Sequence, residues 1–461
     1  MIDLSSYAKT LNGRPIAVFG LGVSGIATLK ALISAGISVT AWDDREENQQ
    51  KAIDLGANVA DLSVIDLIDY EFLVLAPGVP YSFEPHPVVI NAQKSSLEVI
   101  CDIELFHRSG NQTKTIGITG TNGKSTTTAL MTHVLKSAGL NTVMAGNIGV
   151  AIFDLENVSD LDVLVLEMSS YQLDLCPSFR PDISIVLNIT PDHLDRHGSM
   201  QAYIDAKAII LEGIGTAVIG VDDDYTQVLF DQSFLAQTRK VIPVSVKSSI
   251  VEGYFVRQGN LYCNNHGEDI LIHDFQEANY LNLRGLHNQQ NASFVYVVSK
   301  ELGLTDQSIF DAFTSYSGLE HRQYLVAKKG NISYINDSKA TNAEAAAKAL
   351  SSFNNIYWIV GGQAKEGGLE GLEIFKKNIV KTYVIGEAKT EFSAWLQYHG
   401  FAHEISDVLS IAINKANEDA LSSNNECIIL LSPACASWDQ FTSFANRGDV
   451  FTDQVRELIG M

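Results

Sequence analysis

A glycine-rich segment in the first third of the chain carries the residue types needed to bind a nucleoside triphosphate. Gly120 and Gly123 lead directly into Lys124 and Ser125. The backbone N–H groups of such a loop can surround phosphate oxygens, the lysine can neutralise charge on the β- and γ-phosphates, and the serine hydroxyl can ligate Mg²⁺. The strict P-loop pattern would have a glycine where this chain has Ile118. The segment is therefore a variant P-loop that predicts a phosphate site.

Acidic and histidine side chains follow two predicted strands farther along the chain. One strand ends in Glu167, and the next leads to His193. Because ligands in open α/β sheets lie beyond the carboxyl ends of the strands, Ser125, Glu167 and His193 are expected to converge at one edge. A buried carboxylate needs a partner such as a metal ion. Taken singly, His193 could also be a core histidine with satisfied hydrogen bonds, and His197 a solvated one.

A second glycine-rich loop, Gly20–Gly25, follows the first predicted strand and has the pattern GxGxxG. Asp43 and Asp44 come at the end of the next predicted strand, and Arg45 follows them. Such a loop allows a diphosphate to approach the backbone closely, and the helix N-terminus after it favours negative charge. The pattern predicts a dinucleotide or nucleotide-diphosphate site, although a turn that binds nothing has the same pattern. Arg45 could meet a phosphate or be solvated.

The elements that must position these loops are those of an α/β protein. Short runs of Val, Ile and Leu end in Gly, Asn or Asp and precede amphipathic stretches, which predicts buried strands of parallel sheets. The predicted strands are Ile16–Phe19, Ile37–Trp42, Phe72–Leu75, Ile116–Thr119, Val163–Leu166, Ile183–Leu187, Ile332–Ile335, Tyr357–Val360, Tyr383–Ile385 and Ile428–Leu431. Breaks are expected at residues 107–114 and 317–322, and a small antiparallel β element is expected at residues 251–284.

Length and composition predict about three globular domains, because the chain has 461 residues, 46% of them hydrophobic and 19% charged. The net charge of −22 argues against sequence-independent binding of nucleic acid or of an anionic membrane. With no signal-peptide pattern and no apolar run long enough to span a bilayer, a cytoplasmic protein without membrane insertion is expected. The five scattered cysteines predict no disulfide framework and no structural zinc site.

Several short segments resemble motifs of the ATP-dependent Mur ligases and occur in family order along nearly the whole chain. They are Thr119–Ser125, Leu166–Leu173, Asn188–Arg196, Leu286–Ala292, His321–Arg322 and Asn336–Asn342. Within the family, Gly20–Gly25 and Leu431–Phe441 resemble the members that add D-glutamate. The Gly20–Gly25 loop would then hold the diphosphate of a UDP-sugar and not NAD.

The resemblance implies an α/β fold of three domains. Residues 1–112 would form a Rossmann-like domain for the UDP-sugar, residues 113–319 a P-loop ATPase-type central domain for ATP and Mg²⁺, and residues 320–461 a Rossmann-like domain that binds the amino acid and closes on ATP. The implied activity is ATP-dependent ligation of D-glutamate to UDP-N-acetylmuramoyl-L-alanine through an acyl phosphate, in peptidoglycan precursor synthesis. It implies ATP, two Mg²⁺ ions and a monomer.

The resemblance also implies roles for individual residues. The ATP contacts are Gly120, Thr121, Asn122, Gly123, Lys124, Ser125, Thr126, Asn288, Asn291, Arg322 and Asp337. The UDP-substrate contacts are Gly22, Val23, Ser24, Asp43, Asp44, Arg45, Gly78 and Asn147. The D-glutamate contacts are Thr341, Lys365, Ser437 and Phe444, with Lys339 nearby. The metal ligands are Ser125, Glu167, His193 and Lys207, the last as a carbamate; the catalytic residues are Lys124, His193 and Lys207.

Some features depart from the family pattern. Trp438 stands where a smaller apolar residue is expected beside Ser437, and Asp44 stands where many members carry threonine. An acid beside a diphosphate would repel it unless the acid faces the ribose or the base. From the residues alone, Lys207 is an ordinary helix lysine.

Other functions remain open. One is another ligase of this family, such as an L-alanine-adding member or folylpolyglutamate synthase, although the latter is expected to begin near its P-loop. Another is a nicotinamide-dependent dehydrogenase built on Gly20–Gly25, which leaves the P-loop unexplained. A third is a nucleotide-binding scaffold that binds ATP without acyl-phosphate chemistry.

Overall fold

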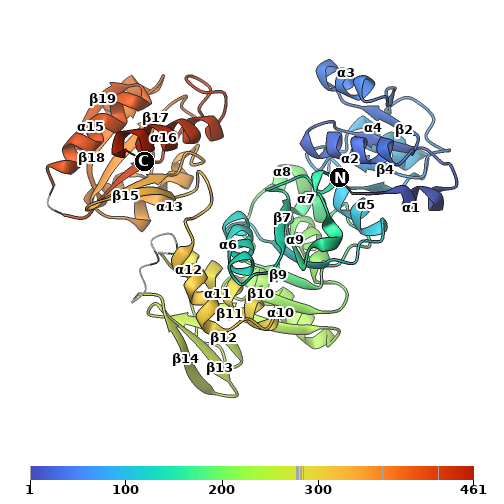
Figure 1. The fold of residues 1–461 in the computed structure, drawn as a ribbon, viewed down its shortest axis with the longest axis horizontal. Helices are drawn as coiled ribbons and strands as arrows, with labels where there is room; N and C mark the ends of the chain where they lie inside the picture. The colour runs from blue at the N-terminus through green and yellow to red at the C-terminus, as the bar shows by residue number, and fades with distance from the viewer. Residues whose placement is uncertain are drawn as a thin grey trace. The chain divides into compact units, whose positions relative to one another are not determined.

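The computed structural model describes residues 2–276, 280, 283, 285–365, 367–423 and 425–460 (Figure 1). Its strands form three sheets, of five, nine and six strands, that follow one another along the chain. The chain divides into two compact units, Met1–Ala278 with Gln289–Phe313, and Asn279–Asn288 with Thr314–Met461. The predicted α/β class is confirmed, and each sheet lies within one of the three predicted domains.

The first sheet has five parallel strands in the order β3-β2-β1-β4-β5. The strands are β1 (Ile16–Phe19), β2 (Val39–Trp42), β3 (Asn58–Val59), β4 (Leu73–Leu75) and β5 (Val99–Ile100). The helices are α1 (Ser5–Ala8), α2 (Val23–Ser34), α3 (Glu46–Asp54), α4 (Pro87–Lys94) and α5 (Asp102–Arg108). The strand order reverses between β1 and β4, and ligands bind at such a point in open α/β sheets.

The second sheet has nine strands in the order β14-β13-β12-β11-β10-β9-β6-β8-β7. The strands are β6 (Lys114–Thr119), β7 (Thr142–Gly146), β8 (Val163–Glu167), β9 (Ile183–Val186), β10 (Thr216–Gly220), β11 (Lys240–Ser245), β12 (Gly253–Arg257), β13 (Asn260–Asn265) and β14 (Glu268–Asp274). The helices are α6 (Lys124–Ser137), α7 (Ser170–Leu173), α8 (Leu194–His197), α9 (Met200–Ala208), α10 (Asp224–Ala236), α11 (Leu286–Glu301) and α12 (Asp306–Ser315). Because β6 pairs in parallel with β8 and β9, the loops after these three strands meet at one edge.

The third sheet has six strands in the order β15-β16-β20-β17-β18-β19. The strands are β15 (Tyr324–Lys329), β16 (Ile332–Asn336), β17 (Ile356–Gly361), β18 (Ile379–Ile385), β19 (His403–Asp407) and β20 (Cys427–Leu431). The helices are α13 (Ala343–Ser352), α14 (Lys389–Tyr398), α15 (Leu409–Leu421) and α16 (Phe444–Ile459). Alternate residues of β17 belong to two apolar cores, one shared with α13 and α14 and the other with α15 and α16. This sheet is therefore covered on both faces.

Each predicted strand overlaps an observed strand. The predicted antiparallel element is confirmed as β12, β13 and β14, although residues 277–279, 281, 282 and 284 of its predicted range lie outside the described residues. The strands β3, β5, β7, β10, β11, β15 and β19 were not among the predicted strands, and of these the edge strand β15 runs antiparallel to β16. All five cysteines are free, and the buried thiols of Cys101 and Cys176 lie 3.4 Å apart. In the described part of the chain, no helix is long and apolar enough to cross a membrane.

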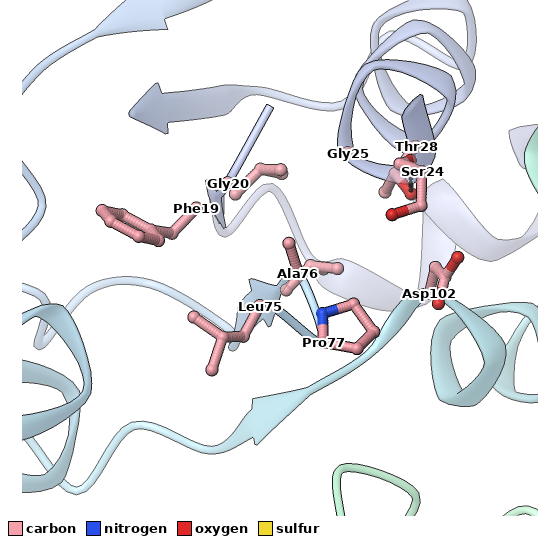
Figure 2. A pocket seen from close by; sticks show the side chains of 11 residues that line it. Phe19, Gly20, Ser24, Gly25, Thr28, Leu75, Ala76, Pro77 and Asp102 are labelled. Atoms are coloured by element: carbon pink, nitrogen blue, oxygen red, sulfur yellow. Dashed lines mark hydrogen bonds between the residues drawn. The ribbon is translucent and has the colours of Figure 1, made fainter. Parts of the chain in front are cut away.

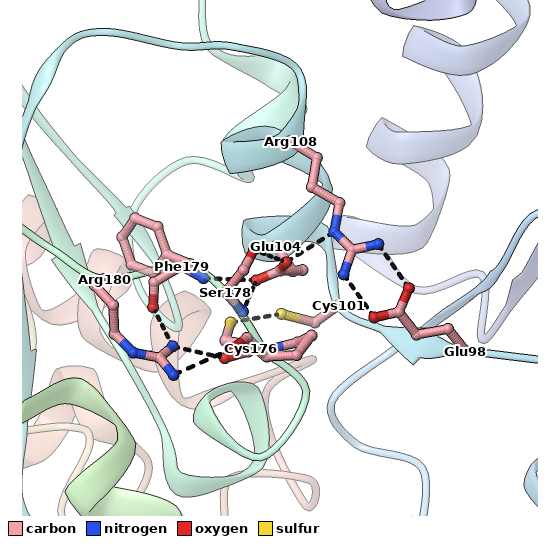
Figure 3. A network of polar contacts seen from close by, with 9 residues as sticks. Glu98, Cys101, Glu104, Arg108, Cys176, Ser178, Phe179 and Arg180 are labelled. Atoms are coloured by element: carbon pink, nitrogen blue, oxygen red, sulfur yellow. Dashed lines mark hydrogen bonds and ion pairs between the residues drawn. The ribbon is translucent and has the colours of Figure 1, made fainter. Parts of the chain in front are cut away.

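A buried polar network joins α5 to the segment that follows α7 (Figure 3). The Glu104 carboxylate is fully buried and accepts hydrogen bonds from the Ser178 hydroxyl, from the backbone N–H groups of Ser178 and Phe179, and from Arg108 Nε at 2.8 Å. Arg108 also makes a bidentate ion pair with Glu98, with both N–O distances at 2.7 Å. These contacts tie the first sheet to the second within one compact unit.

Replacing Glu104 with glutamine is expected to lower the free energy of unfolding by about 2–4 kcal/mol, because buried donors lose a charged acceptor. Burial raises the pKa of Glu104, but the hydrogen bonds from Ser178, Arg108 and Phe179 outweigh burial and hold the pKa below 4.5. A carboxyl with a lowered folded pKa stabilises the protein above its unfolded pKa, and this contribution is lost as the pH falls through the folded pKa. Chemical denaturation should show the deficit at neutral pH and a smaller one below about pH 4. Equal stability at neutral pH would contradict the expectation.

Candidate functional site

The P-loop joins β6 to α6 and is held in shape by the residues after β9. The Thr121 N–H donates to the Asn188 carbonyl at 2.8 Å, and the Asn122 N–H donates to Asn188 Oδ1 at 2.9 Å. Gly123 has φ = 87°, and a Cβ there would lie 2.6 Å from Asn291 Oδ1. A side chain at this position would therefore displace the α11 residue that lies against the loop.

Lys124 is the first residue of α6, and its ammonium group folds back onto the loop. Nζ donates to the carbonyls of Gly120 at 2.7 Å and of Thr121 at 2.9 Å. Ser125, next along the helix, is buried. The site thus combines a lysine charge with a helix N-terminus, and both favour an anion such as a phosphate group.

Lys207 is buried, which corrects the expectation of an ordinary helix lysine. Its side chain comes from α9, and Nζ donates to the Gly120 carbonyl at 3.0 Å and to Thr119 Oγ1 at 3.3 Å. Nζ also lies 4.8 Å from the centre of the Tyr203 ring. Burial, and next the charge of Lys124, lower the pKa of Lys207 well below its ordinary value, which favours the neutral amine over the ammonium form compared with an exposed lysine.

The end of β8 offers a site that fits a divalent cation. Glu167 is 1% exposed, and its Oε1 accepts from Asn147 Nδ2 at 2.6 Å. Among the described residues, none donates a hydrogen bond to its buried Oε2. A buried carboxylate oxygen with no donor is costly unless a cation meets it. Asn147 was expected to face the sugar-nucleotide, and in this structure it orients Glu167.

The described residues contain no cluster of three or more His, Cys, Asp or Glu side chains that could hold a metal ion alone. Mg²⁺ does not require such a cluster, because it binds through one or two carboxylates together with phosphates and water. Glu167 and the Ser125 hydroxyl, next to a phosphate loop, are therefore a chemically suitable set.

Of the two histidines after β9, His193 is partly exposed and His197 is buried. This is the reverse of the alternative in which His193 is a core histidine and His197 is solvated. The His193 side chain is 48% exposed, in a left-handed backbone conformation with φ = 54°. Its ring lies 5.1 Å from the Tyr171 ring, and Nε2 is 3.5 Å from Asp192 Oδ2. His197 is buried, and Nε2 contacts Ser170 Oγ at 2.9 Å. His193 is therefore the histidine that can meet a ligand.

The Gly20–Gly25 loop follows β1 and requires glycine at two positions. A Cβ on Gly20, which has φ = 89°, would lie 2.5 Å from the Ala76 Cβ, and one on Gly25 would lie 2.0 Å from the Gly20 carbonyl oxygen. Of the other predicted substrate contacts, Gly22, Val23 and Gly78 are exposed, Ser24 is half-buried, and the Arg45 side chain is 65% exposed. The loop thus presents backbone and small side chains toward solvent.

A small pocket beside this loop is lined mainly by residues of β1, β4 and α2, and by Asp102 at the start of α5 (Figure 2). Burial raises the pKa of Asp102 to about 6, and the hydrogen bond from the Ile103 N–H opposes the rise. The sequence does not mark Asp102 as a site residue, because aspartate is common at helix N-termini, where it caps the helix.

In the second unit, Asp337 follows β16 and lies near Arg322. Asp337 is buried, and its carboxylate accepts from Ser432 Oγ at 2.7 Å and from the Gln323 N–H at 3.1 Å. Burial raises its pKa to about 7, while these hydrogen bonds and the Arg322 charge act in the opposite direction. On α11, the two asparagines expected to contact ATP, Asn288 and Asn291, are both buried and lie about one turn apart.

The residues expected to bind D-glutamate all lie in the second unit, on loops and on the first turn of α16. The backbones of Gln363 and Ala436 exchange two hydrogen bonds, so the loop carrying Lys365 lies against the loop carrying Ser437. Lys365 is exposed and Ser437 is buried. The Lys339 Nζ lies 5.6 Å from the centre of the Phe444 ring. The Thr341 N–H donates to the Lys339 carbonyl at 2.9 Å, and Trp438 is 67% exposed.

Arg447 links these loops, and the sequence reasoning missed it. Its guanidinium is 1% exposed and donates to Ser338 Oγ at 2.9 Å, to the Ser338 carbonyl at 2.8 Å, to the Cys435 carbonyl at 3.1 Å and to the Ala436 carbonyl at 3.4 Å. Burial lowers its pKa to about 10. Spacing could have revealed it, since Arg447 lies one turn before the buried Phe451 on α16.

Comparison with known proteins agrees with this geometry. Residues 118–299 match the Mur ligase middle domain. The chain is 44% identical to UDP-N-acetylmuramoylalanine--D-glutamate ligase of Rhizobium meliloti (strain 1021), over 100% of this chain and 99% of that protein. It is 43% identical to the protein of that name from Caulobacter sp. (strain K31), over 98% and 97%. The structure of UDP-N-acetylmuramate-alanine ligase from Thermotoga maritima, 18% identical, aligns over 96% of this chain and 99% of its own with a TM-score of 0.56, which shows a shared fold. The chain belongs to the Mur ligase family.

Proposed function

We propose that this chain is an ATP-dependent ligase that joins the amine of D-glutamate to the carboxylate of UDP-N-acetylmuramoyl-L-alanine, in peptidoglycan precursor synthesis. The observation that carries the proposal is the gathering of Lys124, Lys207 and Glu167 around one P-loop. The printed name of full-length relatives at 43–44% identity supports the choice of substrates.

The first step would activate the alanine carboxylate, which is a poor electrophile. A carboxylate oxygen attacks the γ-phosphorus of ATP, and the bond between that phosphorus and the bridging oxygen of the β-phosphate breaks. The products are ADP and an acyl phosphate. Positioning and charge neutralisation supply most of the rate enhancement in phosphoryl transfer. Lys124, at the N-terminus of α6, would neutralise charge on the transferred group.

Mg²⁺ would be held by Ser125 and Glu167, with a second ion near His193 and Lys207, and it would neutralise phosphate charge when bound. Lys207 would act as a carbamate: its neutral amine would form a bond to the carbon of CO₂ and lose a proton to solvent, which gives an anionic side chain with two oxygen donors suited to Mg²⁺. The buried setting and lowered pKa of Lys207 support this role.

In the second step the D-glutamate amine attacks the acyl carbon, a tetrahedral intermediate forms, and the bond to the phosphate oxygen breaks. The amine loses a proton, and the amide and inorganic phosphate are released. A dianionic amino acid needs cationic and hydroxyl donors. We assign Lys365, Thr341 and Ser437 to this role, with Phe444 and Lys339 beside them.

We further propose that residues 1–112 bind the UDP-sugar, residues 113–319 bind ATP, and residues 320–461 bind the amino acid. Arg322 and Asp337 would contact the nucleotide, as would Asn288 and Asn291. A reaction that consumes ATP and a nucleotide-linked precursor belongs in the cytoplasm, and the free cysteines agree with a reducing compartment. A monomer would suffice for the proposed site.

An amine-acceptor screen with UDP-N-acetylmuramoyl-L-alanine held constant tests this proposal. ADP and phosphate should form only when ATP, Mg²⁺, the sugar-nucleotide and D-glutamate are all present. Equal rates with L-alanine, lysine or diaminopimelate would refute the specificity for D-glutamate. Saturable binding of NADH, with no binding of uridine nucleotides, would instead favour a dehydrogenase.

Replacing Arg447 with lysine is expected to raise the KM for D-glutamate about tenfold with a smaller change in kcat, because lysine cannot hold the three carbonyls and the hydroxyl at once. The buried carbonyl and hydroxyl acceptors that it leaves unpaired should also lower the free energy of unfolding by about 2 kcal/mol. Arg456→Lys, at the exposed end of the same helix, is the matched control and should match the native enzyme. An unchanged KM in Arg447→Lys would contradict a positioning role.

A further inference from the structure

Two cysteines that are 75 positions apart in the sequence meet inside the protein (Figure 3). Cys101 follows β5 of the first sheet, and Cys176 comes shortly after α7, which follows β8 of the second sheet. Their sulfur atoms lie 3.4 Å apart, and both side chains are fully buried. The thiol pair therefore spans the contact between the first and second sheets, within one compact unit.

Hydrogen bonds around the pair hold the two sulfurs in this arrangement. The Cys101 N–H donates to the Leu175 carbonyl at 3.0 Å, and the Cys101 thiol contacts the Gln172 carbonyl oxygen at 3.6 Å. In the first turn of α5, the Glu104 carboxylate accepts two backbone N–H groups from the segment that follows Cys176. Neither segment can move away from the other without breaking buried hydrogen bonds, so the sulfurs stay near contact.

The separation is short enough for a disulfide to form with little rearrangement. A disulfide bond is about 2.0 Å long, so the sulfurs must approach by about 1.4 Å from their separation of 3.4 Å. Rotations of the two side chains about their Cα–Cβ bonds can share that movement with a small shift of the segment after α7. A metal ion is a poorer occupant, because the described residues contain no cluster of three or more His, Cys, Asp or Glu side chains that could complete a tetrahedral zinc site.

We propose that Cys101 and Cys176 are a redox-sensitive pair, which peroxide oxidises to a reversible disulfide that cross-links the first and second sheets and slows the enzyme. The Cys101 sulfur attacks one oxygen of hydrogen peroxide, the O–O bond breaks, and a sulfenic acid and water form. The Cys176 sulfur then attacks the sulfenic sulfur, the S–S bond forms, and the S–O bond breaks to release a second water. The pair gives up two electrons and two protons, and exchange with a dithiol restores both thiols.

The surroundings of Cys176 make this oxidation slow. Burial, and next the hydrogen bond with Cys101, raise the pKa of the Cys176 thiol well above its ordinary value, and the carboxylates of Glu104 and Asp102 on α5 act in the same direction. The thiolate is the reacting form of cysteine, so a thiol that stays protonated should react over minutes to hours. The pair would therefore stay reduced in a reducing compartment and respond to sustained oxidant.

The cross-link would act on the enzyme through α7. This four-residue helix ends three residues before Cys176, so it moves with that segment. Its Tyr171 ring lies 5.1 Å from the His193 ring, and Ser170 Oγ lies 2.9 Å from His197 Nε2. Drawing Cys176 toward α5 should therefore shift His193, which the proposed function places at a metal site. This effect on activity rests on the proposed function, whereas formation of the disulfide does not.

Counting the thiols of the native enzyme that can be alkylated tests the inference. The reduced protein is treated with hydrogen peroxide, unfolded, and alkylated at every remaining thiol. All five cysteines should react before oxidation, and three, which is five minus the joined pair, should react after it. Dithiothreitol should restore the count to five. Digestion without reductant should yield two peptides joined through Cys101 and Cys176.

The stability and activity of the oxidised enzyme give two further readouts. The melting temperature should rise by about 3–8 °C, because the cross-link closes a loop of about 75 residues in the unfolded chain. The kcat for ligation should fall about three- to tenfold, because groups at the site are displaced, and should recover with dithiothreitol.

Cys101→Ala and Cys176→Ala should each keep four alkylatable thiols after peroxide treatment, with no change in melting temperature or kcat. Cys263→Ala, which removes a half-buried thiol of β13, is the matched control and should respond to peroxide as the native enzyme does. Thermal unfolding of the reduced variants checks that they fold. Serine variants at the two buried positions repeat the test with side chains closer in size to cysteine.

The outcomes separate the inference from the proposed function. Five alkylatable thiols after prolonged peroxide treatment, a loss of thiols that dithiothreitol does not restore, or a disulfide between other cysteines would show the inference to be wrong and leave the proposed function untouched. A Cys101–Cys176 disulfide that leaves kcat unchanged would refute the control of activity. An enzyme that ligates in neither redox state would contradict the proposed function, while the thiol count and the melting temperature would still decide whether the cross-link forms.

Discussion

Lys124→Ala is expected to reduce kcat for ligation by about a hundred- to a thousandfold, the loss typical when one group that stabilises transition-state charge is removed. The ammonium of Lys124 lies on the P-loop, within hydrogen-bond distance of the Gly120 and Thr121 carbonyls, at the start of α6. Its removal leaves the transferred phosphoryl group without that charge. Phosphate release at saturating ATP, D-glutamate and sugar-nucleotide measures the effect.

The matched control for this variant lies on the same helix. Lys136→Ala removes an exposed lysine near the opposite end of α6 and should leave kcat unchanged. A second effect of Lys124→Ala follows from the structure, because the charge of Lys124 also lowers the pKa of Lys207. The variant should therefore bind CO₂ less readily at neutral pH. Undiminished ligation by Lys124→Ala would refute the proposed role.

Lys207→Arg is expected to lose at least about a hundredfold in kcat, although it keeps the positive charge and the hydrogen-bonding capacity of the side chain. Arginine stays protonated and cannot form a carbamate, whereas burial lowers the pKa of Lys207 and so favours its neutral amine. The native enzyme should lose activity when CO₂ is removed from the buffer and regain it when bicarbonate is added. A ¹³C carbamate resonance from labelled bicarbonate should appear in the native protein alone.

A merely structural role for Lys207 would give a different result. In that case Lys207→Arg would lose activity, but the activity of the native enzyme would not change when CO₂ is removed or bicarbonate is added. The pH dependence has a definite sign, since carbamate formation consumes the neutral amine and should weaken as the pH falls. Full activity of Lys207→Arg, or a native enzyme indifferent to CO₂, would overturn the assignment.

The P-loop and the strands were predictable because their signals are local. Gly120, Gly123 and Lys124 stand between an apolar run and a helix, and the conformational needs of the loop are visible in those few residues. Glu167 was predictable for a similar reason, because an acid at the end of an apolar strand has no place in a core without a partner.

Other parts of the site depend on contacts between distant residues. Asp44 contacts His86, which lies 42 positions away in the sequence. Nothing in the local sequence tells that Asp43, and not Asp44, accepts a hydrogen bond from the backbone of the Gly20–Gly25 loop, at the Leu21 N–H. His193 and His197 lie at the two ends of the four-residue helix α8, and both rings pack against Tyr171, whereas only His197 contacts the buried Ser170. The sequence alone could not assign these exposures.

Two buried basic residues, Lys207 and Arg447, have the same signal in the sequence, because each lies one helical turn from a buried aromatic residue. Lys207 lies four residues after the buried Tyr203 on α9, and Arg447 lies four before the buried Phe451 on α16. A charged residue on the apolar face of a helix is costly unless it is paired or has a function. Such positions deserve the same scrutiny as glycine-rich loops.

Reductive trapping of the acyl phosphate tests the central claim most directly. The native enzyme is incubated with UDP-N-acetylmuramoyl-L-alanine, ATP and Mg²⁺, without D-glutamate, and treated with borohydride, which reduces an acyl phosphate to an alcohol. The account predicts an alaninol-bearing sugar-nucleotide with the native enzyme and with Lys136→Ala, and at least about a hundredfold less of it in the same time with Lys124→Ala. Amide synthesis on adding D-glutamate, with no reduced product before it under any of these conditions, would contradict the account.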